Sequence, residues 1–240
     1  MNLSIIIPLY NEENSIIKVL EKLNLLDYPC FVGKIEIIVV DDYSNDNSLQ
    51  KVSNFIKDFN SIYEIKLLKH TENKGKGAAV RTGVQAASGD TILVQDSDLE
   101  LSPEDIPRLL NAMNSLNVSF INGSRYMPGI IRPIFSLDRY LGNRIFTLLA
   151  SFLMNVKISD LACGYKLIKK DLFSKLNLKE NRFGFEAELF IKSMRIAKGD
   201  MAEVPVNYFP RTTRQGKKLK NSDGFKILAV IFKYGLFNAK

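Results

Sequence analysis

Two carboxylates separated by one residue, Asp96 and Asp98, are the side chains in this 240-residue sequence that most directly suggest chemistry. They follow a short apolar run, 91–95, that is typical of a buried strand. Oxygen ligands at this spacing can face one hard cation, and Mg²⁺ or Mn²⁺ held in this way commonly bridges to substrate phosphates. Glu100 is a candidate third ligand. The alternative is that the Asp-Ser-Asp stretch only caps the following helix.

A second acidic pair, Asp41 and Asp42, follows another apolar run at 35–40. Adjacent carboxylates at a strand end repel each other, so they usually have a ligand or a hydrogen-bond donor to satisfy. One of them could accept from a base N–H or a ribose hydroxyl. The alternative is a helix cap, a role better suited to Ser44 or Asn45.

A glycine-containing turn comes next, and it leads into a helical pattern. Its central residues are Lys74, Gly75, Lys76 and Gly77. Small residues let the backbone approach a ligand, and a helix N-terminus favours anions. The turn matches neither the Walker A pattern nor the G-x-G-x-x-G fingerprint, so it is a weak signal by itself.

Glu186 and Glu188 begin a later helical pattern. Either could act as a base or orient a ligand, and favourable charge at a helix N-terminus is the equally good alternative.

Six basic residues are candidate phosphate clamps, because Arg in particular makes bidentate contacts with phosphate oxygens. They are Arg125, Arg139, Arg211, Arg214, Lys217 and Lys218. The net charge is +7, and the excess of Lys and Arg falls in 205–240. A basic tail on a near-neutral body favours an anionic partner, which could be nucleic acid, anionic lipid or a phosphate substrate. For any one of these residues a solvated surface position is the alternative.

The elements that must position these side chains alternate between short apolar runs and helical patterns. We predict strands at 3–8, 35–40, 63–68, 91–95 and 118–122, and helices at 13–26, 46–58, 76–87, 103–116, 137–154, 185–197 and 222–237. This alternation predicts a single α/β domain with an open, mostly parallel sheet. Ligands bind beyond the carboxyl ends of the strands in such sheets. The acidic pairs and the Tyr-Asn-Glu stretch at 10–12 should therefore meet at one edge.

Composition narrows the class of protein. With 46% hydrophobic residues the chain can bury one substantial core. Its two cysteines lack metal-ligand spacing and indicate reduced thiols. Because the chain has a single histidine, His70, a histidine zinc site or a Ser-His-Asp triad is not expected. His70 itself is expected on the surface at a strand end. No signal peptide or membrane-span pattern is recognised, so a cytoplasmic location is expected, with peripheral membrane contact left open.

Taken together, the motifs resemble family-2 glycosyltransferases with the GT-A fold, and among them the dolichyl-phosphate mannose and glucose synthases. The matching stretches are IPLYNE at 7–12, VDDYS at 40–44, NKGKG at 73–77, QDSDLE at 95–100, GSRY at 123–126, the segment from Asp160 to GYK at 164–166, and EVPV at 203–206. They run in the family's order over nearly the whole chain. We expect one GT-A domain over 1–220, with a Rossmann-like nucleotide-binding half and an acceptor half, and a basic amphipathic helix over 221–240.

The resemblance implies a role for each motif. The donor nucleotide would be held by Pro8, Tyr10, Glu12 and Asp42, with Asp41 and the 74–77 turn lining its pocket. Asp96, Asp98 and Glu100 would bind Mg²⁺ or Mn²⁺ and the donor diphosphate. The acceptor phosphate would be gripped by Arg125, Arg139 and Arg211, with Lys217 and Lys218 in the same basic tail. Reaction at the anomeric carbon would be a single inverting displacement.

The reaction that we predict is transfer of a hexose from GDP-mannose or UDP-glucose to a polyprenyl or dolichyl phosphate. A phosphate acceptor is already an anion, so it needs little help from a general base. The apolar helices at 137–154 and 222–237 would lie on the cytoplasmic face of a membrane. The sugar, the base and the oligomeric state are left open.

Three alternatives are distinguishable. A saccharide or another lipid as acceptor would require a carboxylate base, for which Asp160 or Glu186 is the candidate. A nucleotidyltransferase would need a glycine-rich loop after the first strand, where the Tyr-Asn-Glu stretch stands instead. Nucleic-acid binding is not expected, because the basic residues gather in a tail beside an apolar helix rather than alternating with aromatic residues across a face.

Overall fold

The computed structural model describes residues 1–58, 61–129, 137–211 and 223–237. The strands in these ranges form one seven-stranded sheet, in the order β3-β2-β1-β4-β6-β5-β7. Their bounds are β1 Leu3–Leu9, β2 Ile35–Asp41, β3 Glu64–Lys69, β4 Thr91–Val94, β5 Phe120–Ser124, β6 Lys166–Lys169 and β7 Met201–Pro205. β6 runs antiparallel to both of its neighbours, and the other pairs are parallel. The mostly parallel α/β sheet that the sequence predicts is therefore confirmed.

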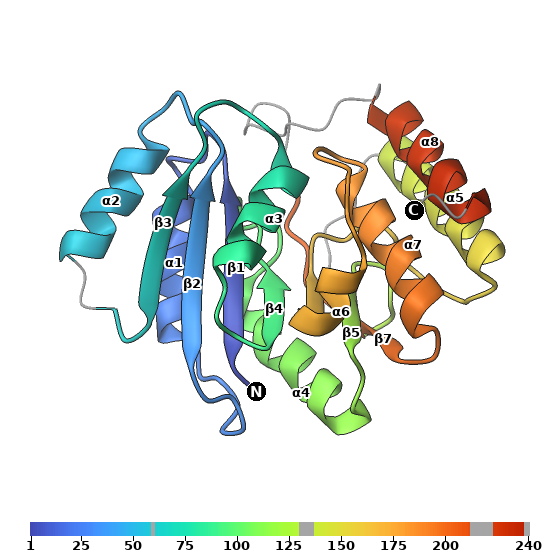
Figure 1. Cartoon of the computed structure of the whole chain (residues 1–240), viewed down its shortest axis with the longest axis horizontal. Coiled ribbons are helices and arrows are strands. Elements are labelled where there is room, and N and C mark those ends of the chain that lie inside the picture. Colours follow the sequence, from blue (N-terminus) through green and yellow to red (C-terminus); the bar gives the residue numbers. More distant parts are fainter. Residues whose placement is uncertain (59–60, 130–136, 212–222, 238–240) are drawn as a thin grey trace.

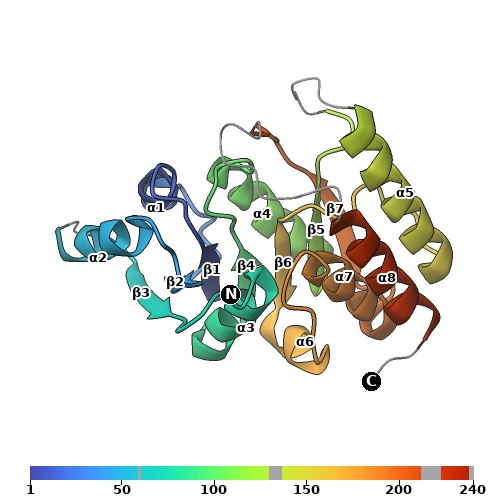
Figure 2. The same cartoon turned by 90° about the horizontal axis from the view of Figure 1, so that it is seen from above.

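Helices cover both faces of this sheet. Their bounds are α1 Ile16–Leu25, α2 Ser48–Asp58, α3 Lys76–Ala86, α4 Ile106–Leu116, α5 Leu137–Met154, α6 Lys170–Lys175, α7 Phe185–Ala197 and α8 Asp223–Leu236, and a 3₁₀ turn at Pro103–Asp105 precedes α4. Seen from above, α1 and α4 lie on one side of the sheet and α3, α6 and α7 on the other (Figure 2). Within the described ranges no helix is both long and apolar enough to cross a bilayer.

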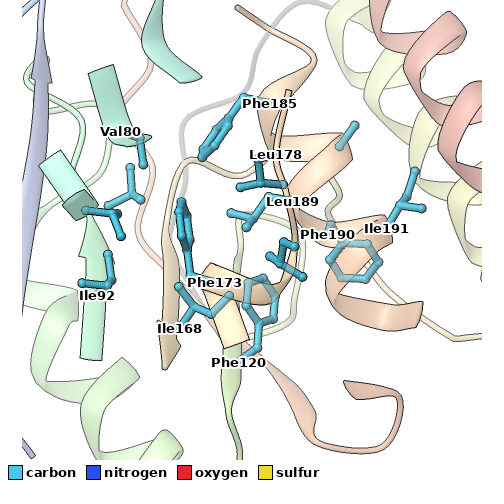
Figure 3. Close-up of a cluster of buried hydrophobic side chains, with 14 of the residues drawn as sticks. Val80, Ile92, Phe120, Ile168, Phe173, Leu178, Phe185, Leu189, Phe190 and Ile191 are labelled. Atoms are coloured by element: carbon cyan, nitrogen blue, oxygen red, sulfur yellow. The ribbon is translucent and has the colours of Figure 1, made fainter. Parts of the chain in front are cut away.

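Alternating side chains of the inner strands produce the two hydrophobic layers. In β1, Ile5 and Ile7 face the α1 and α4 side, whereas Ile6 faces α3. All three side chains are fully buried, because parallel strands carry helices on both faces. On the α3 side, aromatic residues of β5 and α7 fill the space between sheet and helices, and the rings of Phe120 and Phe190 meet edge to face (Figure 3). The core is therefore continuous from the half of the domain that contains β1–β4 into the half that contains β5–β7.

α8 belongs to this core. It packs against α5 and α7, and its residues Ile227, Val230, Ile231 and Tyr234 are buried there. Figure 1 shows α5 and α8 side by side at the end of the molecule farthest from α2. The boundary that the sequence predicts at 220–221 lies outside the described residues, but the helix that follows it shares one core with the rest.

The strands and helices predicted from periodicity are found close to their expected bounds. The helices at 137–154 and 185–197 begin and end as predicted. The predicted helix at 103–116 divides into a 3₁₀ turn and α4. The prediction missed β6, α6 and β7, because these short elements contain charged residues and so lack a continuous apolar run like that of β4. These missed elements complete the sheet in the second half of the chain.

The direction of the strand order changes between β1 and β4. The chain continues from β1 to β2 on one side and from β4 to β5 on the other, so it leaves these two neighbouring strands in opposite directions along the sheet. Such a switch point is where open α/β sheets bind ligands. The polar stretches at 10–12 and 95–100 follow these two strands.

Candidate active site

Asp96 follows β4 and is held by a lysine from across the switch point. Lys76, the first residue of α3, lies with its Nζ 2.6 Å from Asp96 Oδ1 and 2.7 Å from Glu186 Oε1. Burial by itself lowers the pKa of the Lys76 ammonium, but the charges of Asp96 and Glu186 outweigh it, and the pKa stays above its ordinary value. Lys76 is therefore a permanent cation between the predicted metal ligand and the start of α7.

Asp98 lies in a tight turn that crowds several carboxylates. Its Oδ1 accepts from the backbone N–H of Glu100 at 3.0 Å, and Leu99 between them has a left-handed φ of 60°. Its Oδ2 accepts from Arg211 Nη2 at 3.0 Å. Burial first, and then the negative charges of Asp96 and Glu100, raise the pKa of Asp98 to about 6. The turn thus holds more negative charge than one arginine neutralises.

The helix-cap alternative for this stretch is wrong. The residue that caps the turn before α4 is Ser102, whose hydroxyl accepts from the N–H of Glu104 at 3.4 Å. Asp96 and Asp98 are consequently not used to cap α4.

The three predicted metal ligands are not gathered around one point. Glu100 directs its Oε1 to the backbone N–H of Arg211 and its Oε2 to the hydroxyl of Tyr208, each at 2.9 Å. Within the part of the chain that the structure describes, no three Asp, Glu, His or Cys side chains are arranged to hold a metal ion. The structure therefore does not support Glu100 as a third ligand in this conformation.

Asp96 and Asp98 nevertheless suit a hard divalent cation. Both present carboxylate oxygens, and burial together with the charges of Asp96 and Glu100 raises the pKa of Asp98, so a cation beside it would be favourable. Two carboxylates completed by substrate phosphates are a common arrangement for Mg²⁺. Metal binding stays a prediction for these two residues.

Arg211 takes a different place from the one that the resemblance implies. Its guanidinium bonds both carboxylate oxygens of Glu12, at 2.7 and 3.0 Å, as well as Asp98. In this structure it partly offsets the charge of Glu12 and Asp98 instead of standing open to an acceptor phosphate. Lys217 and Lys218 lie outside the described residues. Arg139 lies exposed in the first turn of α5.

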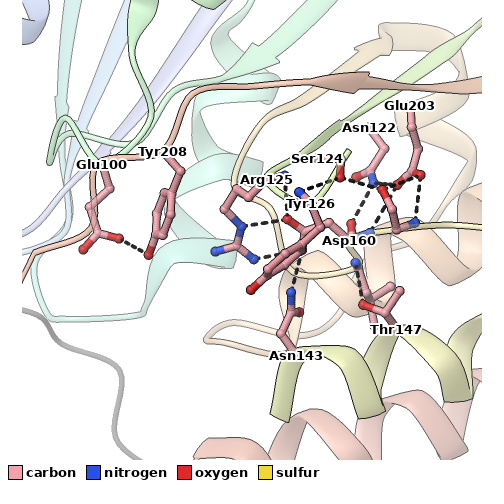
Figure 4. A network of polar contacts seen from close by, with 12 residues as sticks. Glu100, Asn122, Ser124, Arg125, Tyr126, Asn143, Thr147, Asp160, Glu203 and Tyr208 are labelled. Atoms are coloured by element: carbon pink, nitrogen blue, oxygen red, sulfur yellow. Dashed lines mark hydrogen bonds and ion pairs between the residues drawn. The ribbon is translucent and has the colours of Figure 1, made fainter. Parts of the chain in front are cut away.

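Arg125 and Asp160 form a buried ion pair between β5 and the segment before β6. The guanidinium Nε and Nη2 reach the two carboxylate oxygens at 2.7 and 2.8 Å, and Asn143 of α5 donates to the same carboxylate at 3.0 Å (Figure 4). The Arg125 guanidinium also lies 5.0 Å from the ring centroid of Tyr208 and 5.7 Å from that of Tyr126. This arrangement fixes the plane of the Arg125 guanidinium beside Tyr208, which in turn bonds Glu100.

The structure argues against Asp160 as a general base. Its side chain is fully buried. Burial alone raises the pKa of its carboxyl, but Arg125 and the hydrogen bonds to the carboxylate outweigh this effect and lower the pKa. A buried carboxylate that holds its charge against an arginine is a poor proton acceptor for a substrate hydroxyl.

The residues predicted for the nucleotide surround the ends of β1 and β2. Pro8 accepts at its carbonyl from the hydroxyl of Ser97 at 3.1 Å, and Tyr10 lies half-buried after β1. Asp41 is fully buried, with one carboxylate oxygen accepting from the N–H of Ser44 at 3.3 Å. Its other oxygen has no hydrogen-bond partner among the described residues. Asp41 therefore offers no open face to a base.

Asp42 is used inside the protein. It is buried, and its carboxylate accepts from the N–H groups of Lys74 and Gly75, at 2.9 and 2.7 Å, and contacts the imidazole of His70. The expectation that His70 is a surface residue is wrong, because the ring is buried between Asp42 and α3. No periodicity could have revealed this contact between segments far apart in the chain.

The glycines of the 74–77 turn are required for close contacts within the protein, and their predicted place beside the nucleotide stays a prediction. A Cβ on Gly77 would clash with the carbonyl oxygen of Glu180, and one on Gly75 with that of Asn181. The N–H of Gly77 donates to the carbonyl of Asn181 at 2.8 Å. These glycines let the segment before α7 approach the start of α3, so their close contact is with protein.

Tyr208 is a site residue that the sequence analysis missed. It follows β7, itself unpredicted, and it contacts both Glu100 and Arg125. The EVPV stretch at 203–206 could have indicated Tyr208, because the residues that follow this stretch lie beside Glu100.

Comparisons with known proteins agree with this geometry. The sequence profile described as Glycosyl transferase family 2 matches residues 4–176. The chain is 30% identical, over 97% of its length, to the dolichol-phosphate mannosyltransferase of Pyrococcus furiosus. It is 29% identical, over 90% of its length, to the dolichyl-phosphate beta-glucosyltransferase of Homo sapiens. The chain spans 63% and 69% of the length of these two relatives.

A solved structure shows the same fold. Glucosyl-3-phosphoglycerate synthase from Mycobacterium tuberculosis, in complex with Mn²⁺, UDP-glucose and phosphoglyceric acid, superposes with a TM-score of 0.74 at 17% identity. The match covers 98% of this chain and 80% of that one. With the family profile covering most of the sequence, the conclusion is direct: the chain belongs to glycosyl transferase family 2 and has the GT-A fold.

Proposed function

We propose that this glycosyltransferase moves a hexose from a nucleotide-sugar donor to a polyprenyl phosphate, with Asp96 and Asp98 binding a divalent metal. One observation carries the proposal. Tyr208 hydrogen-bonds Glu100 and stacks on Arg125, so a fixed guanidinium stands beside the acidic turn after β4 (Figure 4). An anionic acceptor at Arg125 would then lie next to a donor bound at the carboxylates.

The donor side supports a metal-bound diphosphate. Asp96 and Asp98 follow the central strand β4 at the switch point, and Asp98 has excess negative charge around it. A bound Mg²⁺ or Mn²⁺ would neutralise charge on the departing nucleoside diphosphate. The solved relative in complex with Mn²⁺ and UDP-glucose and the two dolichyl-phosphate relatives support a donor of this class.

The acceptor side supports a phosphate rather than a hydroxyl. Arg125 is oriented by Asp160 and by two aromatic rings, which suits it to hold an anion in a defined position. A saccharide acceptor would need a carboxylate base, but Asp160 is buried and Glu186 is paired with Lys76. A phosphate that already carries its charge needs no such base.

Two helices support contact with a lipid surface. Along α5 the exposed apolar residues recur at helical spacing, at Leu137, Leu141, Ile145, Leu148 and Phe152. α8 beside it exposes Phe225, Phe232 and Leu236. Basic residues accompany both stripes, with Arg139 on α5 and Lys226 and Lys233 on α8. This combination is typical of helices that lie in a membrane interface.

The decisive experiment is a transfer assay with a short polyprenyl phosphate, Mg²⁺ or Mn²⁺, and a panel of GDP- and UDP-sugars. We expect one donor to yield a polyprenyl-phosphate sugar that is lost when the metal is chelated. Asp98→Asn should abolish turnover, whereas Asp171→Asn, an exposed aspartate on α6, should retain it. Donor hydrolysis without a glycolipid would contradict the proposed acceptor, and no binding of any donor would contradict the donor class.

Vesicle co-sedimentation tests the proposed membrane contact separately. The double variant Leu148→Ser/Phe152→Ser should bind anionic vesicles about tenfold or more weakly, because two exposed apolar side chains are lost from the stripe. Leu25→Ser on α1, a residue just as exposed, is the matched control and should bind like the unmodified protein. Equal binding by the double variant would place the lipid contact elsewhere.

A further inference from the structure

The chain's single histidine connects three parts of the nucleotide-binding half. His70 follows β3, and its exposed fraction is 7%. Its backbone N–H donates to the carbonyl of Asp41 at 2.9 Å, which extends the pairing of β3 with β2. Its Nδ1 lies 2.7 Å from Asp42 Oδ1, and its Nε2 lies 2.9 Å from the hydroxyl of Thr82 on α3.

The carboxylate that His70 contacts organises the next turn of the chain. Asp42 Oδ1 also accepts from the N–H of Lys74 at 2.9 Å, and Oδ2 accepts from the N–H of Gly75 at 2.7 Å. The carbonyl of Asp42 accepts from the side chain of Asn73 at 3.2 Å. Because Asp42 is buried, the loss of any of these hydrogen-bond donors would leave a buried oxygen without a partner. Such a loss costs free energy.

The 73–75 turn then determines where α3 begins. Gly75 has a φ of 97° and is the residue before the helix, and Lys76 is its first residue. Lys76 Nζ then reaches Asp96 and Glu186. A continuous series of contacts therefore runs from the imidazole through Asp42 and the turn to the carboxylate after β4.

We propose that His70 is a positioning residue for the donor site. Its Nδ1–H donates to Asp42 and fixes the carboxylate in the orientation that shapes the 73–75 turn and aims Lys76 at Asp96. An ionised carboxylate only accepts, so Nδ1 must carry the proton, and in the neutral ring Nε2 then accepts from Thr82. Side chains of a binding site keep their geometry when a second set of hydrogen bonds holds them. The inference rests on the proposed nucleotide-sugar donor.

The ring nitrogens can be observed directly, because one histidine gives one set of imidazole signals. In the untagged ¹⁵N-labelled protein without ligand, a proton-nitrogen correlation spectrum should show a proton on Nδ1, whether or not Nε2 also carries one. A neutral ring protonated only on Nε2 would overturn the proposal, because Nδ1 could not then donate to Asp42.

Two variants separate hydrogen-bond donation by the imidazole ring from the volume that the ring fills. His70→Leu keeps the bulk but removes the N–H, whereas His70→Asn retains an amide N–H near the position of Nδ1. In His70→Leu the backbone N–H signals of Lys74 and Gly75 should shift away from their unmodified positions, and in His70→Asn they should stay close to them. Unchanged signals in a folded His70→Leu protein would overturn the proposal.

Calorimetric titration with GDP and UDP, each with Mn²⁺, tests whether the position of the 73–75 turn affects nucleotide affinity. For whichever nucleotide the unmodified protein binds, His70→Leu should weaken affinity about tenfold or more, and His70→Asn by about threefold or less. At saturating donor, kcat of His70→Leu should fall less than the affinity does. Equal affinity in His70→Leu would overturn the proposal. If the unmodified protein binds neither nucleotide, the proposed donor fails, and the resonance experiments still decide the role of His70.

Discussion

Arg211 Nη2 lies 3.0 Å from Asp98 Oδ2. The arginine that we expected to bind the acceptor phosphate therefore pairs with a carboxylate that we expected to bind the metal. The same guanidinium bonds both oxygens of Glu12, which follows β1. Burial lowers the pKa of Arg211, but Glu12 and Asp98 outweigh that effect and raise it, so it remains charged. A cation of the protein itself thus offsets part of the negative charge at Asp98 and Glu12.

Removing that charge should strengthen binding of a divalent cation. In Arg211→Gln, Asp98 loses its paired cation, and we expect Mn²⁺ affinity without nucleotide to rise about tenfold, since close charges near a protein surface interact by a few kcal/mol at most. Electron paramagnetic resonance of free Mn²⁺ measures this affinity. Lys175→Gln, an exposed lysine on α6, is the control and should leave it unchanged. An unchanged or lower affinity in Arg211→Gln would contradict competition between Arg211 and a cation for Asp98.

Asp98→Asn should stabilise the protein at neutral pH. The pKa of Asp98 is raised to about 6, so the folded state binds its proton more tightly than the unfolded chain does. Stability is therefore lost as the pH rises through about 6, and asparagine avoids that loss. We expect a gain of about 1–3 kcal/mol at pH 7.5, or roughly 2–4 °C in Tm for each kcal/mol, and no gain below pH 4. A gain independent of pH would contradict this reasoning.

Asp160→Ala should destabilise the half of the domain that contains β5–β7, instead of leaving a stable but inactive protein. The substitution removes the carboxylate that pairs with the Arg125 guanidinium, whose side chain is only 15% exposed, and breaking such a pair typically costs about 3–5 kcal/mol. Urea denaturation measures the change in unfolding free energy. Asp171→Ala, whose side chain is 71% exposed in its ion pair with Lys175, should change it by less than about 1 kcal/mol. A fully stable Asp160→Ala protein without activity would restore Asp160 as a candidate base.

Gly77→Ala should destabilise the protein, although alanine ordinarily favours a helix. The added Cβ would clash with the carbonyl of Glu180, so α3 and the segment before α7 must separate, at about 1–3 kcal/mol. Gly142→Ala on α5 meets nothing within 4 Å and should be stabilising by about 0.5–1 kcal/mol. Thermal denaturation of the two variants provides the comparison, and equal midpoints would contradict the close contact at Gly77.

The sequence by itself determined the first half of the sheet and the order of its motifs. The runs that became β1 and β2 are apolar and bounded by turns, and such runs are buried whatever packs on them. Because parallel strands end at one edge, the polar residues after β1, β2 and β4 could be placed together without knowing any contact. The short β6 and β7 carried too little pattern to be recognised.

Only the tertiary structure decided which partner each polar side chain takes. Hydrogen bonds and ion pairs depend on atoms that come within about 3 Å of each other, and no local pattern records which distant segment supplies them. The sequence predicted a ligand contact for Asp42, and the structure adds His70, Lys74 and Gly75 as partners of its oxygens. Arg211 is almost the length of the chain away from Glu12, yet it bonds both of its carboxylate oxygens, because β7 returns the chain beside the acidic turn.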